Sequence, residues 1–370
     1  MSRARDIADL SAVSARLDTL GASSGALSNR NVLVNGAMNV AQRAVSATGV
    51  GASTGYFTCD RWKYYTSGTA GRVTLTQDSS GPSGFANSFK IATTTADTSV
   101  AASEQVMIQQ RIEGQNLQHF KKGTSDALPW TLSFYVKGNA SATYVAELMD
   151  SDNSDRHVNK QFTVGTDWSR VVIEFPADTT GVLDDDNNVS IDLHIILHSG
   201  STFTSGTLQE TWGALNQANR AVGISSILDS TARTFFITGV QLEAGSVTDF
   251  EHEPVSVSLA KCQRYLTDLT PASAPYIPGT GAVPHNNTAV AVAHVALPVT
   301  MRASPSVSIT TASDYSLYDG TTFTCNAVAV NGLSPNGGGI NFGVSSGLTA
   351  RSAVGIYTNG DKRTFLVAEL

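Results

Sequence analysis

The stretch Trp130-Thr-Leu-Ser-Phe-Tyr-Val-Lys137 places a large apolar side chain at every second position and stops at Gly138-Asn139. This alternation predicts a β-strand, because successive side chains of a strand point to opposite faces of its sheet. Similar runs occupy residues 168–175, 189–197 and 234–242, and we expect residues 143–149 to form the strand next to 130–137. The run 189–197 predicts a half-buried strand with a solvated end. Trp130 and Trp168 begin two of these strands, and both are expected to be buried.

The composition predicts a mainly all-β chain of several parts. A length of 370 residues is more than one core usually supports, and a Gly-rich chain with 15% charged residues and many short alternating runs is typical of β-sandwiches and barrels. We predict a short N-terminal helix and linker (1–30), a β-sandwich (31–254), a connector (255–287) and a smaller C-terminal β domain (288–370). The pattern of strands in 31–254 resembles the jelly-roll sandwich of carbohydrate-binding modules.

The charge pattern argues against several classes of protein. The net charge is −7, and no Lys/Arg run is longer than Lys121-Lys122, whereas a duplex-binding protein needs a basic face. No apolar run reaches the roughly 18 residues of a membrane span, and the N-terminus lacks the apolar core of a signal peptide. Three widely spaced cysteines do not form a disulfide framework, and we expect them to be buried. We therefore expect no nucleic-acid partner, no membrane insertion and no secretion signal.

The N-terminal segment predicts an amphipathic helix that needs a partner. Its apolar side chains recur at steps of three and four. They are Ile7, Leu10, Val13, Leu17 and Leu20. A lone helix of this length is marginally stable in water, so it must pack on something. The alternatives are three copies around an axis, a groove on a tail or capsid protein, and the helix's own domain.

A second set of motifs resembles a known family. One runs Ile237-Thr-Gly-Val-Gln-Leu-Glu-Ala-Gly245 and continues as Thr248-Asp-Phe-Glu251 and Lys261-Cys-Gln-Arg-Tyr265. The others are Asn31-Val-Leu-Val-Asn-Gly-Ala-Met-Asn-Val-Ala-Gln-Arg43, Asp60-Arg61-Trp62, Leu297-Pro-Val-Thr-Met-Arg-Ala-Ser-Pro305 and the ending Ala368-Glu-Leu370. In this order they resemble a signature of phage tail-fibre-like virion proteins. The same residues also have a structural interpretation, in which Gln241 and Glu243 hold the sandwich to the chain that follows, with Arg264 or Arg61 as an ion-pair partner of Glu243.

No constellation predicts catalysis or a metal centre. Two GxSxG matches, at residues 21–25 and 51–55, lack the strand and helix of a nucleophile elbow, so we expect no enzyme. His194 and His198 lie about 13 Å apart along a strand, too far to share one metal ion, and are expected on a solvated face. The acidic loops 150–155 and 184–188 are expected to be solvated turns, with a structural calcium ion as the alternative. No other cofactor is expected.

The resemblance implies a virion protein that is assembled in the host cytoplasm. We expect a homotrimeric tail fibre or receptor-binding protein, held to phage tail or capsid proteins by its N-terminal helix and bound to a host surface glycan. A head-decorating or other capsid fibre is the alternative. Binding is expected in C-terminal loops, where aromatic and amide groups suit a sugar. The candidate contacts are Tyr276, His285, Asn286, Asn287, Tyr315 and Tyr318.

Overall fold

The computed structural model describes residues 29–269, 281–284, 287–360 and 362–370. The chain divides into two compact units, Met1–Val255 and Ser256–Leu370, and each is described by itself. The predicted anchor helix with Ile7, Leu10, Val13, Leu17 and Leu20 lies outside the described residues.

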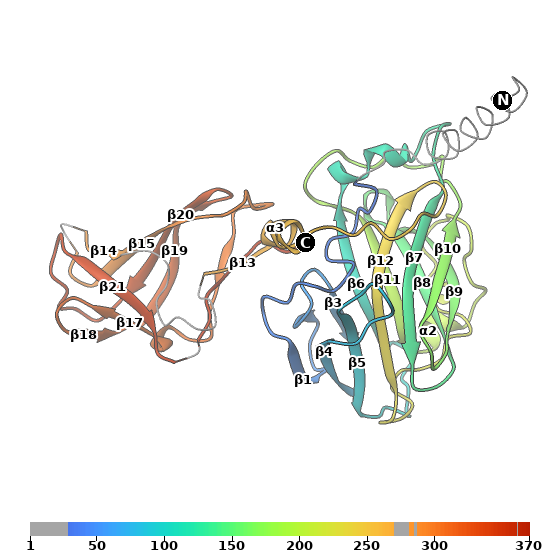
Figure 1. Cartoon of the computed structure of the whole chain (residues 1–370), viewed down its shortest axis with the longest axis horizontal. Helices are drawn as coiled ribbons and strands as arrows, with labels where there is room; N and C mark the ends of the chain where they lie inside the picture. Colours follow the sequence, from blue (N-terminus) through green and yellow to red (C-terminus); the bar gives the residue numbers. More distant parts are fainter. Residues whose placement is uncertain (1–28, 270–280, 285–286, 361) are drawn as a thin grey trace, which may run out of the picture. The chain divides into compact units, whose positions relative to one another are not determined.

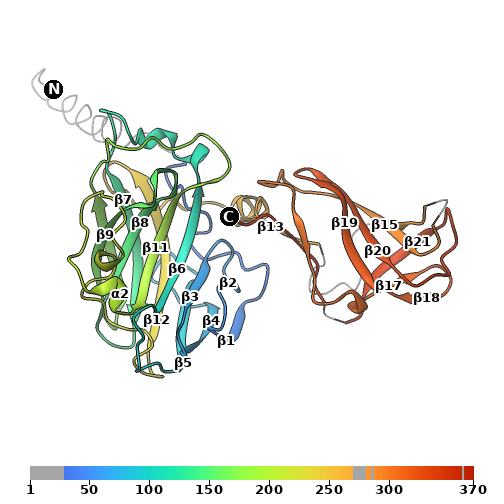
Figure 2. The ribbon, with the colours of Figure 1, turned by 180° about the vertical axis from the view of Figure 1, so that it is seen from behind.

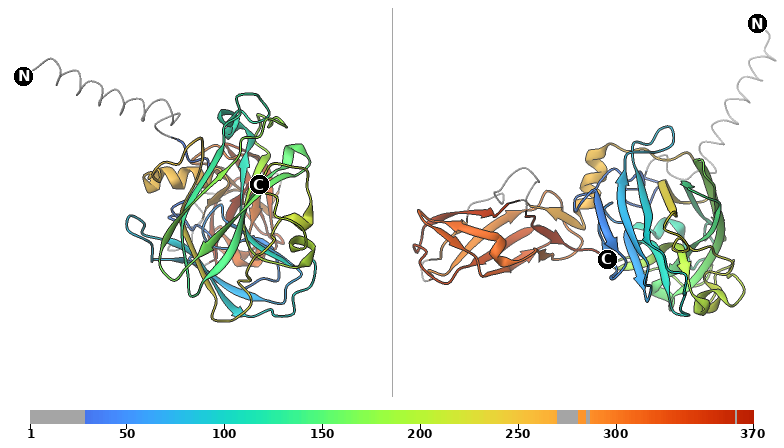
Figure 3. Two further views of the ribbon diagram at one scale, coloured as in Figure 1. Left: turned by 90° about the vertical axis from the view of Figure 1, so that its right-hand side faces the viewer. Right: turned by 90° about the horizontal axis from the view of Figure 1, so that it is seen from below.

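The first unit is a sandwich of two six-stranded sheets with antiparallel pairing throughout (Figures 1 and 3). Sheet A has the order β1 (Ser46–Val50), β4 (Arg72–Asp78), β5 (Ser88–Thr95), β12 (Thr234–Ala244), β7 (Trp130–Gly138), β10 (Ser169–Phe175). Sheet B has the order β2 (Gly55–Tyr56), β3 (Lys63–Ser67), β6 (Gln105–Glu113), β11 (Val189–Ser199), β8 (Ala142–Asp150), β9 (Arg156–Val164). The structure confirms the mainly-β prediction with its central sandwich.

The core lies between these sheets and contains the inward side chains of the predicted strands. Trp130, Leu132, Phe134 and Val136 of β7 are all buried in it, as their spacing predicts. Trp168 departs from the prediction, because it precedes β10 at the surface and stays partly exposed, with the Lys137 ammonium 5.0 Å from its ring centre.

The prediction that residues 143–149 pair with 130–137 is wrong. β8 does form there, but it pairs with β11 and β9 in sheet B, whereas β7 belongs to sheet A. The turn after Gly138 carries the chain from one sheet to the other. Alternation fixes which side chains face the core but not which strand is the neighbour.

Sheet B is covered on its outer side by residues 200–227, here called the cover segment (Figure 2). It contains α2 (Ser201–Thr204) and the short 3₁₀ helix η4 (Gln217–Asn219). Its Ala221 packs on outward residues of sheet B in a second small apolar cluster, with Phe203 and Leu208 beside it. Strand β11 is consequently buried on both faces, so the prediction of a half-buried strand with a solvated end is wrong. The alternation within a strand cannot show that a separate segment covers its polar face.

The boundary between the units falls at the start of α3 (Val255–Gln263), which lies in the segment expected to be a connector. That segment also supplies β13 (Leu266–Asp268) and β14 (Gly281–Ala282). A three-stranded sheet has the order β13 (Leu266–Asp268), β22 (Phe365–Val367), β16 (Ser306–Ser308). A seven-stranded sheet has the order β18 (Thr322–Thr324), β17 (Tyr315–Tyr318), β21 (Ala353–Thr358), β14 (Gly281–Ala282), β15 (Val290–Ala296), β20 (Gly337–Gly343), β19 (Ala327–Ser334). Its core includes Leu317, Phe342, Ile356 and Leu366.

Candidate functional site

The first group of predicted residues is the signature motif at the end of β12. The Gln241 amide nitrogen donates to Glu243 at 2.9 Å and to Thr248 Oγ1 at 3.0 Å, and its oxygen accepts from the Glu251 amide at 2.8 Å. Glu243 accepts from the backbone and the hydroxyl of Thr248 at 2.8 and 2.7 Å. Both side chains are buried. They therefore fold the following chain back onto β12, which supports the structural interpretation of this motif.

The opening motif meets the same strand from the other end of the sequence. The Asn31 side chain donates to Val240 O at 3.0 Å and accepts from Leu242 N at 3.1 Å. Glu251 accepts from the backbone amides of Asn29, Arg30 and Asn31 at 2.5, 2.7 and 3.2 Å. A side chain on Gly36 would place its Cβ 2.1 Å from Val240 O, so only glycine allows this approach.

The Asp60-Arg61-Trp62 motif completes this arrangement. Asp60 accepts from the backbone amide and side chain of Gln42 at 2.8 and 2.5 Å, and the Trp62 indole donates to Asn35 O at 3.1 Å. Arg61 donates to Arg111 O at 2.7 Å. The three motifs, separated in sequence, are thus joined to one another by hydrogen bonds, and Trp62, Gln241 and Glu243 are buried at their centre.

A buried ionic cluster lies between sheet B and the cover segment. The Arg220 guanidinium donates to both Glu147 oxygens, at 2.8 and 2.5 Å, and the Glu147 side chain is fully buried. His194 Nδ1 lies 2.6 Å from Glu147 Oε2, and His157 Nδ1 lies 3.4 Å from Oε1. Burial alone would raise the pKa of Glu147, but the charge and hydrogen bonds of Arg220 outweigh it and hold that pKa well below its usual range. The cluster fastens the cover segment to the sheet.

The expectation that His194 and His198 lie on a solvated face is therefore wrong. They are 3% and 0% exposed, and His198 lies between Ser226 and Glu104 at 2.7 and 3.1 Å. Next to His194, Asp192 accepts from Gln109 at 2.5 Å and from Arg111 at 3.0 Å. Asp192 and Gln109 are only 4% and 5% exposed. This polar strip is closed to a ligand as large as a sugar chain.

The acidic loop 150–155 is organised around a lysine. The Lys122 ammonium donates to Asp150 at 2.5 Å and to the carbonyls of Thr180 and Gly181 at 2.9 and 2.8 Å, and it lies 3.2 Å from Asp178. The side chains of Lys122 and Asp150 are completely buried. Burial raises the pKa of the Asp150 carboxyl, and Lys122 only partly offsets this. An ammonium group therefore already pairs with Asp150, one of the acidic residues that the calcium alternative would assign to a metal ion.

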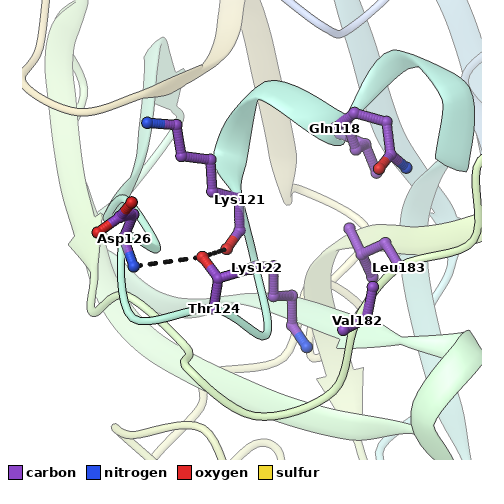
Figure 4. A pocket seen from close by; sticks show the side chains of 8 residues that line it. Gln118, Lys121, Lys122, Thr124, Asp126, Val182 and Leu183 are labelled. Carbon is purple, nitrogen blue, oxygen red and sulfur yellow. Dashed lines mark hydrogen bonds between the residues drawn. The ribbon is translucent and has the colours of Figure 1, made fainter.

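A shallow cavity of about 320 Å³ lies above this lysine, between the 3₁₀ helix η2 (Gln118–Phe120) and residues 182–183. Figure 4 shows its lining, where Lys121 and Lys122 direct their ammonium groups apart. Lys121 and Asp126 contribute opposite charges, and Leu183 contributes an apolar wall. The volume is at the lower end of the range for small-molecule sites, and no aromatic side chain lines the cavity.

The predicted contacts in the second unit have mixed outcomes. Tyr276, His285 and Asn286 lie outside the described residues, and Asn287 is exposed. Tyr315 is fully buried, its hydroxyl lies 2.8 Å from Thr364 Oγ1, and burial raises its pKa. The prediction that Tyr315 contacts a receptor is therefore wrong, because alternation along β17 turns it into the core. Tyr318, by contrast, is 53% exposed.

Tyr318 belongs to a surface of aromatic and hydroxyl-bearing side chains that we call the tyrosine face. In the register of the sheet, Tyr318 lies opposite Thr322 on β18 and Gly355 on β21, and Ser316 lies opposite Tyr357. Paired residues point to the same side of a sheet, so both tyrosines project from one surface. Tyr357 also donates from its hydroxyl to Thr322 Oγ1 at 3.2 Å, two strands away. Its ring therefore lies across β17, above the small Ser316.

The sequence interpretation missed Tyr357. The signal was the alternation of residues 353–358, in which Val354 and Ile356 face the core and Tyr357 faces outward. What could not be found from sequence is the pairing that brings this strand next to Tyr318. The tyrosine face is bordered by the exposed Thr324 and Asn359, and Asn359 accepts from the Ser316 hydroxyl at 3.1 Å.

The remaining chemistry-bearing groups form no further site. Among the described residues, no group of three His, Cys, Asp or Glu side chains is placed to hold a metal ion. The three cysteines are buried, which raises the pKa of the Cys59 thiol and raises that of Cys325 to about 12. Within the same residues, no helix has the length and apolar character to cross a membrane.

Comparisons with known proteins give a limited result. No protein-family model and no curated protein matches the chain. Among solved structures, the chain is similar to one described as CBM4, at 12% identity and a TM-score of 0.30, over 57% of this chain and 97% of the other. A family 11 carbohydrate-binding module from Clostridium thermocellum matches at 12% identity and a TM-score of 0.27, over 56% and 99%. The enzymatically active domain of tailspike protein 4 from bacteriophage CBA120 matches at 12% identity and a TM-score of 0.31, over 59% of this chain and 22% of the other. These values are too low to carry a ligand or an activity over to this chain.

Proposed function

We propose that this protein is a virion attachment protein that binds a host surface glycan through the tyrosine face of its second unit. The virion location rests on the resemblance of its motifs to those of phage tail-fibre-like proteins. The glycan rests on the chemistry of the tyrosine face. A homotrimer, held to the phage tail or capsid through the N-terminal helix, is part of the same proposal.

The single observation that carries glycan binding is the pair Tyr318 and Tyr357 on one open sheet surface. A pyranose ring has an apolar C–H face and a rim of hydroxyl groups. The Tyr357 ring, which lies across β17 with its hydroxyl bound to Thr322, offers a matching apolar surface. Thr322, Thr324 and Asn359 supply uncharged donors and acceptors around the rings. These five side chains carry no charge, which favours a sugar over a ligand that binds mainly through charge.

The test is binding of the full-length protein to host cells and to isolated host surface polysaccharide. Tyr318→Ala and Tyr357→Ala should each weaken binding by about 5- to 30-fold, since each removes a stacking surface worth about 1–2 kcal/mol. Tyr318→Phe keeps the ring and should retain most of the affinity. Tyr56→Ala in the first unit removes a half-buried tyrosine and should leave binding unchanged. Equal binding by both alanine variants and the parent protein would reject the tyrosine face.

A head-decorating or other capsid fibre remains the second candidate, because the same motifs would serve either position on a virion. Labelling the protein on intact particles and locating it by electron microscopy separates head from tail. We also propose that the protein is not an enzyme. Incubation with the bound polysaccharide should release no reducing sugar, and release would contradict this part of the proposal.

A further inference from the structure

The outer face of sheet A carries a row of cationic and aromatic side chains. The register places both Lys90 of β5 and Lys137 of β7 opposite Phe236 of β12. Paired residues point to the same side of a sheet, so all three project together. Their side faces away from the core, because Val136 and Phe235, which precede Lys137 and Phe236 in the chain, are buried in the core.

Trp168 extends this row beyond Lys137. Its ring centre lies 6.2 Å from that of Phe236 at an interplanar angle of 72°, an edge-to-face contact that fixes the indole. Trp168 belongs to none of the apolar core clusters and stays partly exposed, and its N–H group has no hydrogen-bond partner among the described residues. A fixed, partly exposed indole with an available donor is suited to stacking on a ligand and to hydrogen bonding with it.

The Lys137 ammonium is the charge that this surface offers to a ligand. It lies 5.0 Å from the Trp168 ring centre and 4.7 Å from that of Phe236. In the part of the chain that the structure describes, no carboxylate lies within 4.0 Å of it, whereas the Lys90 ammonium lies 3.3 Å from Asp78. Contact with two rings stabilises the position of the Lys137 ammonium but does not neutralise its charge.

We propose that Lys137 and Trp168 bind an acidic polysaccharide whose sugars carry a carboxylate, as uronic acids do. In such a sugar the carboxylate is bonded directly to the pyranose ring, so the charge lies close to the apolar C–H face. Lys137 and Trp168 offer a cation and an aromatic ring that are equally close together. Thr76, opposite Lys90, and Thr234, two residues before Phe236, add hydroxyl groups on the same face. An acidic peptide could pair with the ammonium but has no apolar ring face to match the indole.

The test measures binding of the full-length protein to polygalacturonate, in which every sugar carries a carboxylate, by affinity electrophoresis at low ionic strength. The reference ligand is the same polymer with its carboxylates methyl-esterified, which keeps the rings and removes the charge. The protein should bind the charged polymer about two- to fivefold more tightly than the ester, as expected for one partly exposed ion pair. This preference should disappear at high ionic strength, where exposed charges are screened.

Four variants separate the charge from the ring. Lys137→Gln should lose the preference for the charged polymer, and Lys137→Arg should keep it. Trp168→Ala should weaken binding to both polymers by about 5- to 30-fold, because it removes the stacking surface. Lys160→Gln removes the same charge from β9 in sheet B and should leave binding unchanged. Thermal unfolding of each variant confirms that it is folded.

The inference does not rest on the proposed function, because it concerns other residues and a charged ligand. A folded parent protein that fails to bind polygalacturonate, or that binds both polymers equally, would overturn it. So would binding to polygalacturonate that Lys137→Gln leaves unchanged. The effect of Tyr318→Ala on host-cell binding bears on the tyrosine face alone, so either proposal can fail while the other stands.

Discussion

The buried pair between Arg220 and Glu147 gives the sharpest stability prediction. Arg220→Met keeps the length of the side chain and removes its charge, leaving a fully buried carboxylate without its main partner. Removing one member of a buried ion pair typically costs about 3–5 kcal/mol. For a unit of this size that corresponds to a fall in Tm of about 6–20 °C. The cover segment should also lose its strongest attachment to sheet B.

The pH dependence follows from the depressed pKa of Glu147. The parent protein should keep the stabilising contribution of Glu147 above the unfolded-state value near 4.5 and lose it as the pH falls further. In Arg220→Met, burial raises the pKa of Glu147 without the opposing arginine, so the folded variant gains from taking up a proton. The difference in stability between the two proteins should therefore be largest near pH 7 and shrink toward pH 4.5.

The assay is urea unfolding followed by tryptophan fluorescence. All four tryptophans, at positions 62, 130, 168 and 212, belong to the first unit, so the signal reports this unit alone. The control is Arg233→Met, which breaks a two-bonded pair with Asp229 at 2.6 and 2.7 Å at the surface. Exposed pairs are worth about 0.2–1 kcal/mol. Two outcomes would refute the claim that burial makes the Arg220 pair strongly stabilising. One is an equal loss of unfolding free energy in the two variants, and the other is a loss below about 1 kcal/mol for Arg220→Met at pH 7.

The remaining predictions concern single groups in both units. Gly36→Ala should cost about 1–3 kcal/mol in urea unfolding because its Cβ meets a backbone oxygen, whereas Gly165→Ala has open space and should stay within about 0.5 kcal/mol of the parent. Lys122→Ala should lose about 3–5 kcal/mol, since it leaves Asp150 buried without its ammonium partner. Millimolar calcium should raise the melting temperature of Lys122→Ala and leave that of the parent protein unchanged. The atoms left around the missing ammonium are mostly oxygen atoms, which are the ligands that calcium prefers. A thiol reagent at pH 8 should find none of the three cysteines reactive in the folded protein and all of them reactive in urea, since all are buried.

The local pattern of apolar and polar residues was enough to locate several strands of this protein. The two-residue alternation of 130–137, 189–197 and 234–242 located β7, β11 and β12, because a strand that buries one face in a core must repeat its apolar residues with that period. The same alternation shows that Tyr315 and Tyr318, three positions apart on β17, face opposite sides. Position in the strand, more than residue type, decides which tyrosine can meet a ligand.

Only the tertiary structure decided which segments meet. Residues 31–36 and 240–251 are joined by hydrogen bonds across some two hundred intervening residues. The sequence of either segment does not predict that the other is its partner. The cover segment buries His194 from outside its own strand, so the sequence around this histidine could not show that it is hidden. Tyr357 joins Tyr318 only because β21 pairs with β17. Periodicity records the side of a strand that faces the core, whereas strand neighbours and covering segments depend on long-range packing that short windows of sequence do not contain.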